Sequence, residues 1–201
     1  EKGQDPYATP TIDGAVVYAI GHEGDLICVE RSTGRELWRR NFIDEFGGDY
    51  QCRGAGGGYS ESVLIDGNRL ICTPGAKDAV LAALDKTSGK TIWTARFPED
   101  VGPQGNDLAG FSSPIISHAC GIKQYIQLAG RGLISVSAED GRTLWVYNGI
   151  ANDMYNISTP IVRDDYVLAS TSHVGRSPAG TALLKLVRAG ANIQPEVIYQ
   201  L

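Results

Sequence analysis

The sequence lacks several features that mark common functional classes. Its 18 lysines and arginines are outnumbered by 23 aspartates and glutamates, which gives a formal net charge of −5. A clustered basic surface, the usual footprint of a nucleic-acid-binding protein, is therefore not indicated. No apolar run reaches the roughly 18 residues that a membrane-spanning helix needs, and the first residues lack the basic and then apolar layout of a signal peptide. We therefore expect no nucleic-acid partner and no transmembrane segment in this chain.

Cysteine chemistry is also limited. The four cysteines are Cys28, Cys52, Cys72 and Cys120, and none belongs to a C-x-x-C pair of the kind that zinc and thioredoxin-type sites use. Cys28 and Cys72 lie in apolar runs, where free cysteine behaves as a small hydrophobic residue, so we expect both to be buried thiols. Cys52 and Cys120 lie in polar stretches, and a disulfide between them stays open. The three histidines show no metal-ligand spacing, so we expect no metal site.

Turn-forming residues, in contrast, are abundant. The chain has 25 glycines and 9 prolines in 201 residues, about 17% against a usual value of about 12%. This composition favours many short elements joined by turns over a helical bundle. Short runs rich in β-branched and aromatic residues predict strands. Asp13-Gly14 and Asp66-Gly67 predict tight hairpin turns, because glycine accepts a positive φ without steric cost. The sequence therefore predicts an all-β chain.

Tryptophan marks an internal repeat. Each of the three tryptophans follows a turn glycine by four residues, in the pairs Gly34 and Trp38, Gly89 and Trp93, and Gly141 and Trp145. A small residue stands ten positions before each tryptophan, which leaves room beside the indole ring. Such recurrence at a fixed period is the signature of a repeat architecture.

A second pattern recurs four times along the chain. A serine or threonine at the start of an apolar strand-like run stands at Thr9, Ser62, Ser113 and Thr159. Together the two patterns predict four units of about fifty residues, each with four short strands. Such a sheet cannot bury both faces alone, but sheets stacked around an axis cover one another. We therefore predict about four consecutive four-stranded blades of a β-propeller, with approximate limits 7–43, 59–97, 111–148 and 156–201.

The repeat unit resembles the tryptophan-docking motif of PQQ-like β-propeller repeats. The resemblance is clearest at 83–93, where a small residue, an acid and a Ser-Gly turn precede Trp93. This family includes quinoprotein alcohol dehydrogenases and also non-catalytic relatives, such as the lipoprotein scaffold of outer-membrane protein assembly. The resemblance implies that the three glycine–tryptophan pairs dock neighbouring blades. The fourth unit departs from the motif, because it has no tryptophan and either Tyr199 or an incomplete last strand takes that place.

The resemblance also implies a wider context. Propellers of this family usually have seven or eight blades, so we expect the chain to be part of a larger ring whose remaining blades are its partners. It further implies a periplasmic or otherwise extracytoplasmic location in a bacterium.

Candidate functional residues gather on the long connections between blades. Function concentrates on long loops over a rigid scaffold, and residues 43–59, 98–110 and 148–156 are expected on one face. We expect ligand contacts on this face or near the axis from Glu61, Arg131, His22, His173 and Asn152. Glu61 stands out because the equivalent positions hold alanine or serine, and it either contacts a ligand or ion or faces axial water. The glycine-rich run 53–59 does not predict a nucleotide site, because no helix follows it.

Two functions stay open. The first is a non-catalytic binding or scaffolding module with a protein or peptide partner, for which we assign no cofactor and no catalytic residue. The alternative is a PQQ-dependent quinoprotein alcohol or sugar dehydrogenase with Ca²⁺, whose catalytic residues would lie largely outside this chain. In that family adjacent cysteines form a disulfide against the quinone. The chain has no adjacent cysteines and its tryptophans all belong to the docking motif, so we favour the binding module.

Overall fold

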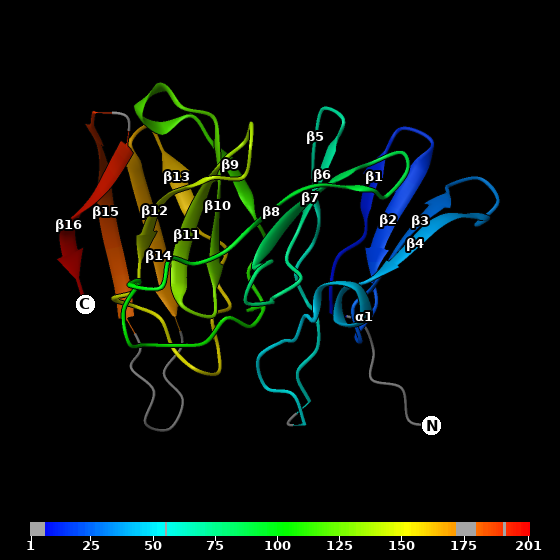
Figure 1. Cartoon of the computed structure of the whole chain (residues 1–201), viewed down its shortest axis with the longest axis horizontal. Coiled ribbons are helices and arrows are strands. Elements are labelled where there is room, and N and C mark those ends of the chain that lie inside the picture. The colour runs from blue at the N-terminus through cyan, green and yellow to red at the C-terminus, as the bar shows by residue number, and fades with distance from the viewer. Residues whose placement is uncertain (1–6, 55, 172–179, 191) are drawn as a thin grey trace.

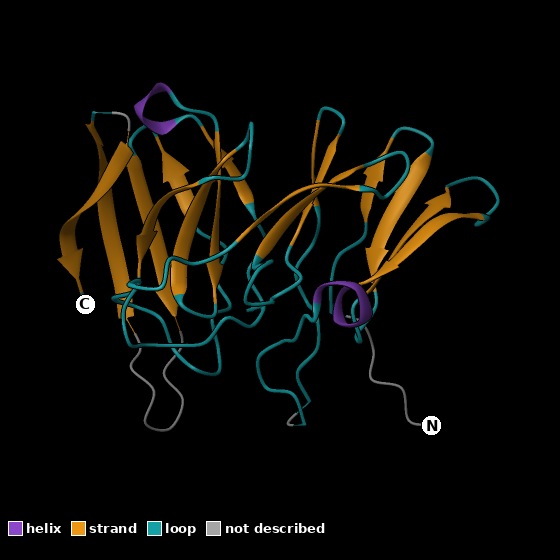
Figure 2. Cartoon of the chain, viewed as in Figure 1, coloured by secondary structure: helices purple, strands orange, loops and turns teal. Residues whose placement is uncertain are grey.

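The computed structural model describes residues 7–54, 56–171, 180–190 and 192–201. Within these residues the chain forms four antiparallel sheets of four strands, and the strands of each sheet are neighbours in sequence order. The sheets stand side by side along an arc (Figure 1), and almost all of the regular structure is strand (Figure 2). The prediction of an all-β chain of four consecutive propeller blades is confirmed.

Each sheet is called a blade and is numbered in chain order. Blade 1 consists of β1 (Thr11–Asp13), β2 (Val16–Ile20), β3 (Asp25–Glu30) and β4 (Glu36–Asn41). Blade 2 consists of β5 (Leu64–Asp66), β6 (Arg69–Cys72), β7 (Leu81–Asp85) and β8 (Thr91–Ala95). Blade 3 consists of β9 (Ile115–Ser117), β10 (Gln124–Ala129), β11 (Gly132–Ser137) and β12 (Thr143–Tyr147). Blade 4 consists of β13 (Ile161–Arg163), β14 (Tyr166–Thr171), β15 (Gly180–Ala189) and β16 (Asn192–Gln200).

Two short helical elements lie in connections that the sequence predicts as loops. The one-turn helix α1 (Phe42–Phe46) follows β4, and the 3-10 turn η1 (Ala119–Gly121) follows β9. The Asn41 side chain caps α1 by accepting hydrogen bonds from the first free backbone N–H groups of the helix. In the described part of the chain, no helix is both long enough and apolar enough to cross a membrane.

The hydrophobic core lies between the blades. Three separate clusters of buried side chains fill the three seams. The first cluster joins Tyr18 of β2 to Leu70 of β6, the second joins Leu81 of β7 to Tyr125 of β10, and the third contains residues of blades 3 and 4. Blades 2 and 3 therefore bury both of their faces, which a single sheet cannot do alone.

The inner ends of the blades are joined by a chain of hydrogen bonds. The backbone N–H of Thr9 donates to Ser62 Oγ at 3.2 Å, Ser62 N–H donates to Ser113 Oγ at 3.0 Å, and Ser113 N–H donates to Thr159 Oγ1 at 3.2 Å. Ser62, Ser113 and Thr159 thus each receive a hydrogen bond from the blade before them. We call this chain the inner ladder. The inner ladder explains why a serine or threonine recurs at this position of the repeat.

The tryptophans contact the turn glycine of the following blade. A Cβ atom placed on Gly89 would lie 2.9 Å from Trp38 Cε3, and one placed on Gly141 would lie 2.5 Å from Trp93 Cε3. Only glycine leaves room for the indole ring there. Cys28 and Ala83 are the direct cross-strand neighbours of Trp38 and Trp93, and a β-bulge follows each pair.

The three rings are not equivalent, although the motif predicts that all are largely buried. Trp93 and Trp145 are buried, but Trp38 is only half-buried. Trp93 lies 6.1 Å from the Tyr125 ring of the next blade, whereas the position equivalent to Tyr125 in the seam of Trp38 holds the smaller Leu70.

Trp145 departs from the docking pattern. Its indole N–H donates to Gln124 Oε1 within its own blade at 2.8 Å. Gly190, in the corresponding turn of blade 4, has no atom within 4 Å of the Cβ position. The expectation that each tryptophan lies beside a turn glycine is therefore wrong for Trp145, because the fourth unit lacks the motif that would receive its ring.

Substitution of the turn glycines separates ring contact from backbone strain. Gly141 has a φ of +75° and lies against Trp93, whereas Gly34 has a φ of +73° and open space around its Cβ position. Both alanine variants incur left-handed backbone strain of about 1–2 kcal/mol. We expect Gly141→Ala to cost about 1–3 kcal/mol more than Gly34→Ala, because overpacking adds to that strain. Urea unfolding measures both, and equal losses would contradict the contact.

All four cysteines are free thiols. Cys28 and Cys72 are buried, as predicted. Cys52 precedes blade 2 on the long-loop side, where its thiol donates to the Met154 carbonyl oxygen at 3.1 Å. Cys120 lies in η1 on the opposite side of the sheets (Figure 2). A disulfide between Cys52 and Cys120 is therefore ruled out in this structure.

Candidate functional site

The long connections between blades meet on the side that carries α1 (Figure 1). An apolar pocket of about 330 Å³ opens there. The described residues that line it are Tyr7, Cys52, Gly56, Gly57, Ser60, Phe111, Tyr155 and Ile157. We call it the axial pocket, because four of these residues come from the segments that enter the inner strands β1, β5, β9 and β13.

The axial pocket is a product of the repeat. Tyr7, Ser60, Phe111 and Ile157 each stand two residues before the hydroxyl residue of the inner ladder. The same position of four units therefore faces one space. Three of the four side chains are apolar or aromatic. The repeat register, extended by two residues toward the N-terminus, identifies this wall from the sequence. The predicted contacts are instead polar and charged residues of the loops.

Aromatic side chains dominate one wall of the pocket. The rings of Phe111 and Tyr155 stack with centroids 5.9 Å apart and an interplanar angle of 20°. Tyr7 and Ile157 are 61% and 46% exposed, so large apolar surface stands open to solvent at the mouth. A protein surface that exposes apolar groups in a concave site is typical of a binding site.

A buried polar network fixes the loop that carries Tyr155. Gln51 donates from Nε2 to the Asn152 carbonyl oxygen at 2.9 Å, and its Oε1 accepts from the Asn156 N–H at 3.1 Å. The side-chain oxygen of Asn152 accepts from the N–H of Tyr155 at 2.6 Å, which closes a turn on the aromatic residue. Gln51, Asn152 and Asn156 are all at most 1% exposed. The stacked pair is therefore held on a rigid base.

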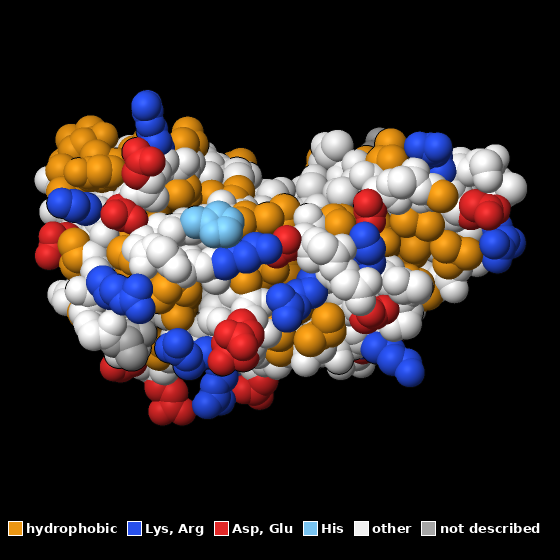
Figure 3. Space-filling model, turned by 90° about the horizontal axis from the view of Figure 1, so that it is seen from above, with side chains coloured by type: hydrophobic (Ala, Val, Ile, Leu, Met, Phe, Trp, Pro, Cys, Tyr) orange, Lys and Arg blue, Asp and Glu red, His pale blue; other side chains and the backbone are white. Residues whose placement is uncertain are grey.

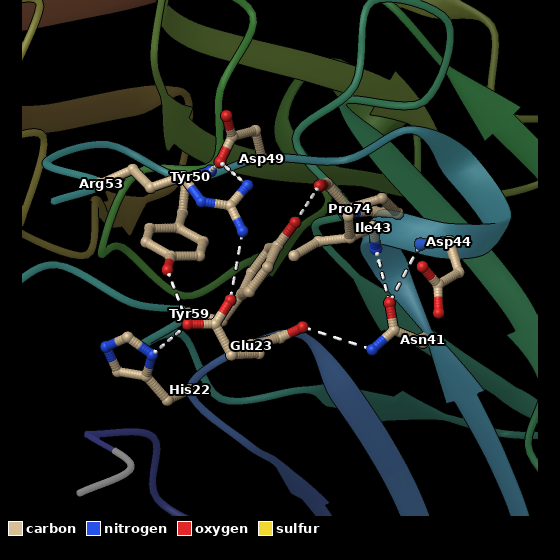
Figure 4. Close-up of polar contacts among 10 residues, drawn as sticks. All are labelled: His22, Glu23, Asn41, Ile43, Asp44, Asp49, Tyr50, Arg53, Tyr59 and Pro74. Atoms are coloured by element: carbon tan, nitrogen blue, oxygen red, sulfur yellow. Dashed lines mark hydrogen bonds and ion pairs between the residues drawn. The ribbon is translucent and has the colours of Figure 1, made fainter. Parts of the chain in front are cut away.

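A second polar cluster lies beside the pocket, on the β2–β3 turn and the connection after α1 (Figure 4). The Glu23 carboxylate lies 3.1 Å from His22 Nδ1 and accepts from the Tyr50 hydroxyl at 3.1 Å. It also pairs with Arg53 at 3.1 Å, and Arg53 pairs with Asp49 at 3.0 Å. Burial acts to raise the pKa of Glu23, but the two hydrogen bonds and the Arg53 charge outweigh it and hold this pKa below its usual value.

Glu61 does not face axial water, contrary to one of the two expectations. Its side chain is fully buried, although it adjoins Ser60 of the axial pocket. Glu61 Oε2 accepts from the Ser60 N–H at 3.0 Å, and Oε1 has no hydrogen-bond partner among the described residues. Burial raises its pKa to about 8, against the lowering effect of backbone hydrogen bonds. The carboxyl is thus held as a neutral acid near pH 7, because the backbone hydrogen bonds do not offset the cost of removing a charged carboxylate from water.

The other predicted contacts are not brought together in one site. His22 belongs to the Glu23 cluster, and its ring packs closely on Gly58. Arg131 pairs with Asp107 at 2.8 Å at a rim cavity of about 220 Å³ between blades 2 and 3. Asn152 supports Tyr155 from within the network. His173 lies outside the described residues.

Comparison with known proteins shows which proteins the chain is similar to. The model of the outer membrane protein assembly factor BamB matches residues 1–54. The BamB of Nitrosomonas eutropha is 27% identical over 142 residues, which is 70% of this chain and 28% of that protein. The BamB of Shewanella oneidensis is 21% identical over 140 residues, or 70% and 32% of the two chains. The chain is thus similar in sequence to proteins of the PQQ-like β-propeller repeat type.

Solved structures show the same fold at low sequence identity. The crystal structure of BamB from Moraxella catarrhalis superposes with a TM-score of 0.65 and 15% identity, covering 98% of this chain and 48% of that one. The quinohemoprotein alcohol dehydrogenase of Comamonas testosteroni gives a TM-score of 0.58 and 14% identity, covering 97% and 40%. The chain therefore spans about a third of the length of the curated relatives and up to half of the length of the solved ones.

The residues of the axial pocket do not fit PQQ. This planar quinone carries carboxylates, which require cationic partners. None of the described residues that line the pocket is a lysine or arginine. Cys52 has no adjacent cysteine in the sequence, and Phe111 and Tyr155 stack on each other. In the described part of the chain, no group of three histidine, cysteine or acidic side chains is placed to hold a metal ion.

Proposed function

We propose that these PQQ-like repeats form a non-catalytic binding module, and that its axial pocket holds apolar side chains of a partner polypeptide. The observation that carries the proposal is the aromatic wall, to which four equivalent repeat positions contribute and which a buried polar network supports. A volume of about 330 Å³ is at the small end for ligand sites and suits one or two side chains of an extended segment.

The likeness to BamB supports this class of function and an extracytoplasmic location in a bacterium. BamB is named as a factor of outer membrane protein assembly, a process whose substrates are polypeptides. Strands of outer-membrane proteins alternate apolar and polar residues and carry aromatic girdles. An extended segment of that kind presents an apolar side chain at every second position and aromatic ones near its ends, which matches the chemistry of the axial pocket.

The dehydrogenase alternative has weaker support. The shared fold with a quinohemoprotein alcohol dehydrogenase is compatible with it, but fold alone does not carry chemistry. Among the described residues, those that line the axial pocket offer no cation for a carboxylated quinone.

Peptide binding tests the proposed function. The probe is a fluorescein-labelled ten-residue peptide that alternates tyrosine or phenylalanine with threonine and serine, compared with the same peptide after replacement of its aromatics by serine. We expect the aromatic peptide to bind and Phe111→Ala to weaken its binding about tenfold, or about 1.4 kcal/mol, because the aromatic contact is lost. Fluorescence anisotropy measures both affinities.

The matched control is Tyr166→Ala, which removes an aromatic residue that is 41% exposed on blade 4 and not part of the pocket. It should leave the affinity unchanged. Thermal melting shows whether each variant is folded. Equal binding of the aromatic and serine peptides, or equal losses in the two variants, would rule out the axial pocket as the peptide site.

A further inference from the structure

The rim cavity between blades 2 and 3 collects basic side chains that the proposed function does not use. Three of its seven lining residues are basic, in a chain whose formal net charge is −5. Both of its walls come from the two central blades, each of which is packed against a neighbour on either side. The lining residues are Lys77, Arg96, Phe97, Pro98, Glu99, Asp107 and Arg131.

A closely packed turn holds Arg131 at this cavity. The Asn148 side chain donates from Nδ2 to the Arg131 carbonyl oxygen at 2.8 Å, and the Gly130 N–H donates to the Leu108 carbonyl oxygen at 3.1 Å. A Cβ atom placed on Gly130 would lie 2.2 Å from the Asn106 carbonyl oxygen, so only glycine lets the turn approach the connection between the blades. The backbone that carries Arg131 is therefore ordered before any ligand binds, which lowers the cost of binding.

The guanidinium of Arg131 has donors without acceptors. Its Nε lies 2.8 Å from Asp107 Oδ1 in an ion pair, but this N–H is not aligned for a hydrogen bond and has no other partner among the described residues. Neither Nη group donates to a described residue, and the side chain is 29% exposed. A guanidinium carries five N–H donors and binds a carboxylate through two of them at once. Arg131 is therefore suited to a bidentate contact that the described chain does not supply.

The other two basic residues of the cavity are weakly engaged. The Arg96 guanidinium pairs with Asp78 at 3.3 Å, where the two side chains are 66% and 79% exposed, so this pair contributes little. Lys77 is exposed and forms no ion pair with a described residue. On the face of the tight turns, basic and acidic side chains are interspersed (Figure 3), and Lys86 and Lys123 each pair with an aspartate.

The remaining lining residues limit what can bind. Phe97 is buried in the core of the seam and Pro98 follows it, so an apolar group can pack beside the basic side chains. Glu99 and Asp107 also line the cavity and repel anions, a dianion about twice as strongly as a monoanion. The lining therefore favours a monoanion that is joined to an apolar group over a phosphate.

We propose that the rim cavity binds a carboxylate attached to an apolar group, with Arg131 donating to both carboxylate oxygens and Phe97 contacting the apolar group. Lys77 and Arg96 add positive charge at the edge of the cavity. Two sources in a partner polypeptide carry this chemistry, an acidic side chain and a free C-terminus. The volume of about 220 Å³ suits one residue. The inference does not depend on the ligand of the axial pocket, whose described lining contains no basic residue.

Nuclear magnetic resonance titration of the full chain tests the proposal, because an arginine Nε–H group gives its own signal. The probe is N-acetyl-leucine, which carries one carboxylate beside an apolar side chain, and the control ligand is its uncharged amide. We expect saturable shifts of the Arg131 Nε–H signal with the acid only. Arg131→Gln should weaken the affinity at least tenfold. The matched control Arg142→Gln removes an exposed arginine from the face of the tight turns and should leave the affinity unchanged.

Glu99→Gln gives a readout of opposite sign. Removal of this acid should strengthen binding about threefold, as expected for one exposed charge interaction. A variant that merely damaged the cavity would weaken binding, so a gain separates the electrostatic role from a structural one. Added salt should weaken the binding of the acid to the wild type, because it screens these charges.

Two peptides distinguish the sources of the carboxylate. One contains Leu-Glu-Leu and has both ends blocked, and the other is acetylated and ends in leucine with a free C-terminus. Tighter binding of the first assigns an acidic side chain, and tighter binding of the second assigns a C-terminal carboxylate.

Four results would overturn the proposal. They are equal affinity for N-acetyl-leucine and its amide, shifts that do not saturate, equal losses in Arg131→Gln and Arg142→Gln, and tighter binding of inorganic phosphate than of N-acetyl-leucine. Circular dichroism shows whether each variant is folded, and the Glu99→Gln gain still tests the site if Arg131→Gln unfolds.

Discussion

Replacement of Glu61 by glutamine is expected to stabilise the protein at neutral and alkaline pH. The folded carboxyl has a pKa of about 8, against 4.5 as its ordinary value. Between these values the folded state holds a proton that the unfolded state has lost, so stability falls as pH rises from about 4.5 to 8 and is level above that. Glutamine keeps the shape without the charge. We expect a gain of about 1–3 kcal/mol at pH 8 that vanishes near pH 4.5.

Urea unfolding at pH 5 and pH 8, followed by tryptophan fluorescence, measures this gain. Glu139→Gln is the matched control, since Glu139 is exposed in the turn after β11, and it should change neither the stability nor its pH dependence. A Glu61→Gln variant whose stability tracks the wild type at both pH values would show that the buried carboxyl is not neutral in the folded state.

Replacement of Trp93 by alanine is expected to cost about 3–5 kcal/mol, as for other buried aromatic side chains. Trp93 is 9% exposed and contributes to the seam between blades 2 and 3, where it covers Gly141 and faces Tyr125. The loss leaves a cavity between two blades. Urea unfolding followed by far-ultraviolet circular dichroism measures the cost, because this signal does not depend on Trp93. The fluorescence of the two remaining tryptophans is a second probe.

Two further variants identify the cause of that loss. Trp93→Phe keeps a ring in the seam and removes no hydrogen bond to a described residue, because the Trp93 indole N–H has no partner among them. We therefore expect it to cost clearly less than alanine. Trp38→Ala should also cost less than Trp93→Ala, since Trp38 is half-buried. Equal costs for Trp38→Ala and Trp93→Ala would argue against the idea that Tyr125 of the next blade buries Trp93 more deeply than Trp38.

The fold could be predicted from the sequence because its signals are local and recur. A glycine four residues before each tryptophan fixes a turn and a docking position together, and three copies in register exclude coincidence. The hydroxyl residues likewise repeat because those of Ser62, Ser113 and Thr159 each accept the same hydrogen bond from the preceding blade. Their periodicity was visible in the sequence, but the direction of the bond from one blade to the next was not.

The site was harder to predict because its contacts are long-range. Gln51 and Asn156 are 105 residues apart and meet only when blades 1 to 3 are stacked, so no spacing in the sequence indicates the network. Glu61 was identified as unusual, but whether a side chain at the axis faces water or the core depends on the neighbouring blade. Phe111 and Ile157 are absent from the predicted site for a different reason. They are in register with the repeat, but the prediction considers only polar and charged residues as candidate contacts.

Placement of the core between blades affects how such a protein grows. Each blade contributes one half of a seam to its neighbour on either side. The inner ladder repeats the same contact at all three seams, and the glycine turns repeat theirs at the first two. Duplication of one unit of the gene therefore adds a blade together with a ready-made partner surface, without any new packing solution. Evolution can change ring size in this architecture by copying, and can reserve point substitutions for the loops that surround the axial pocket.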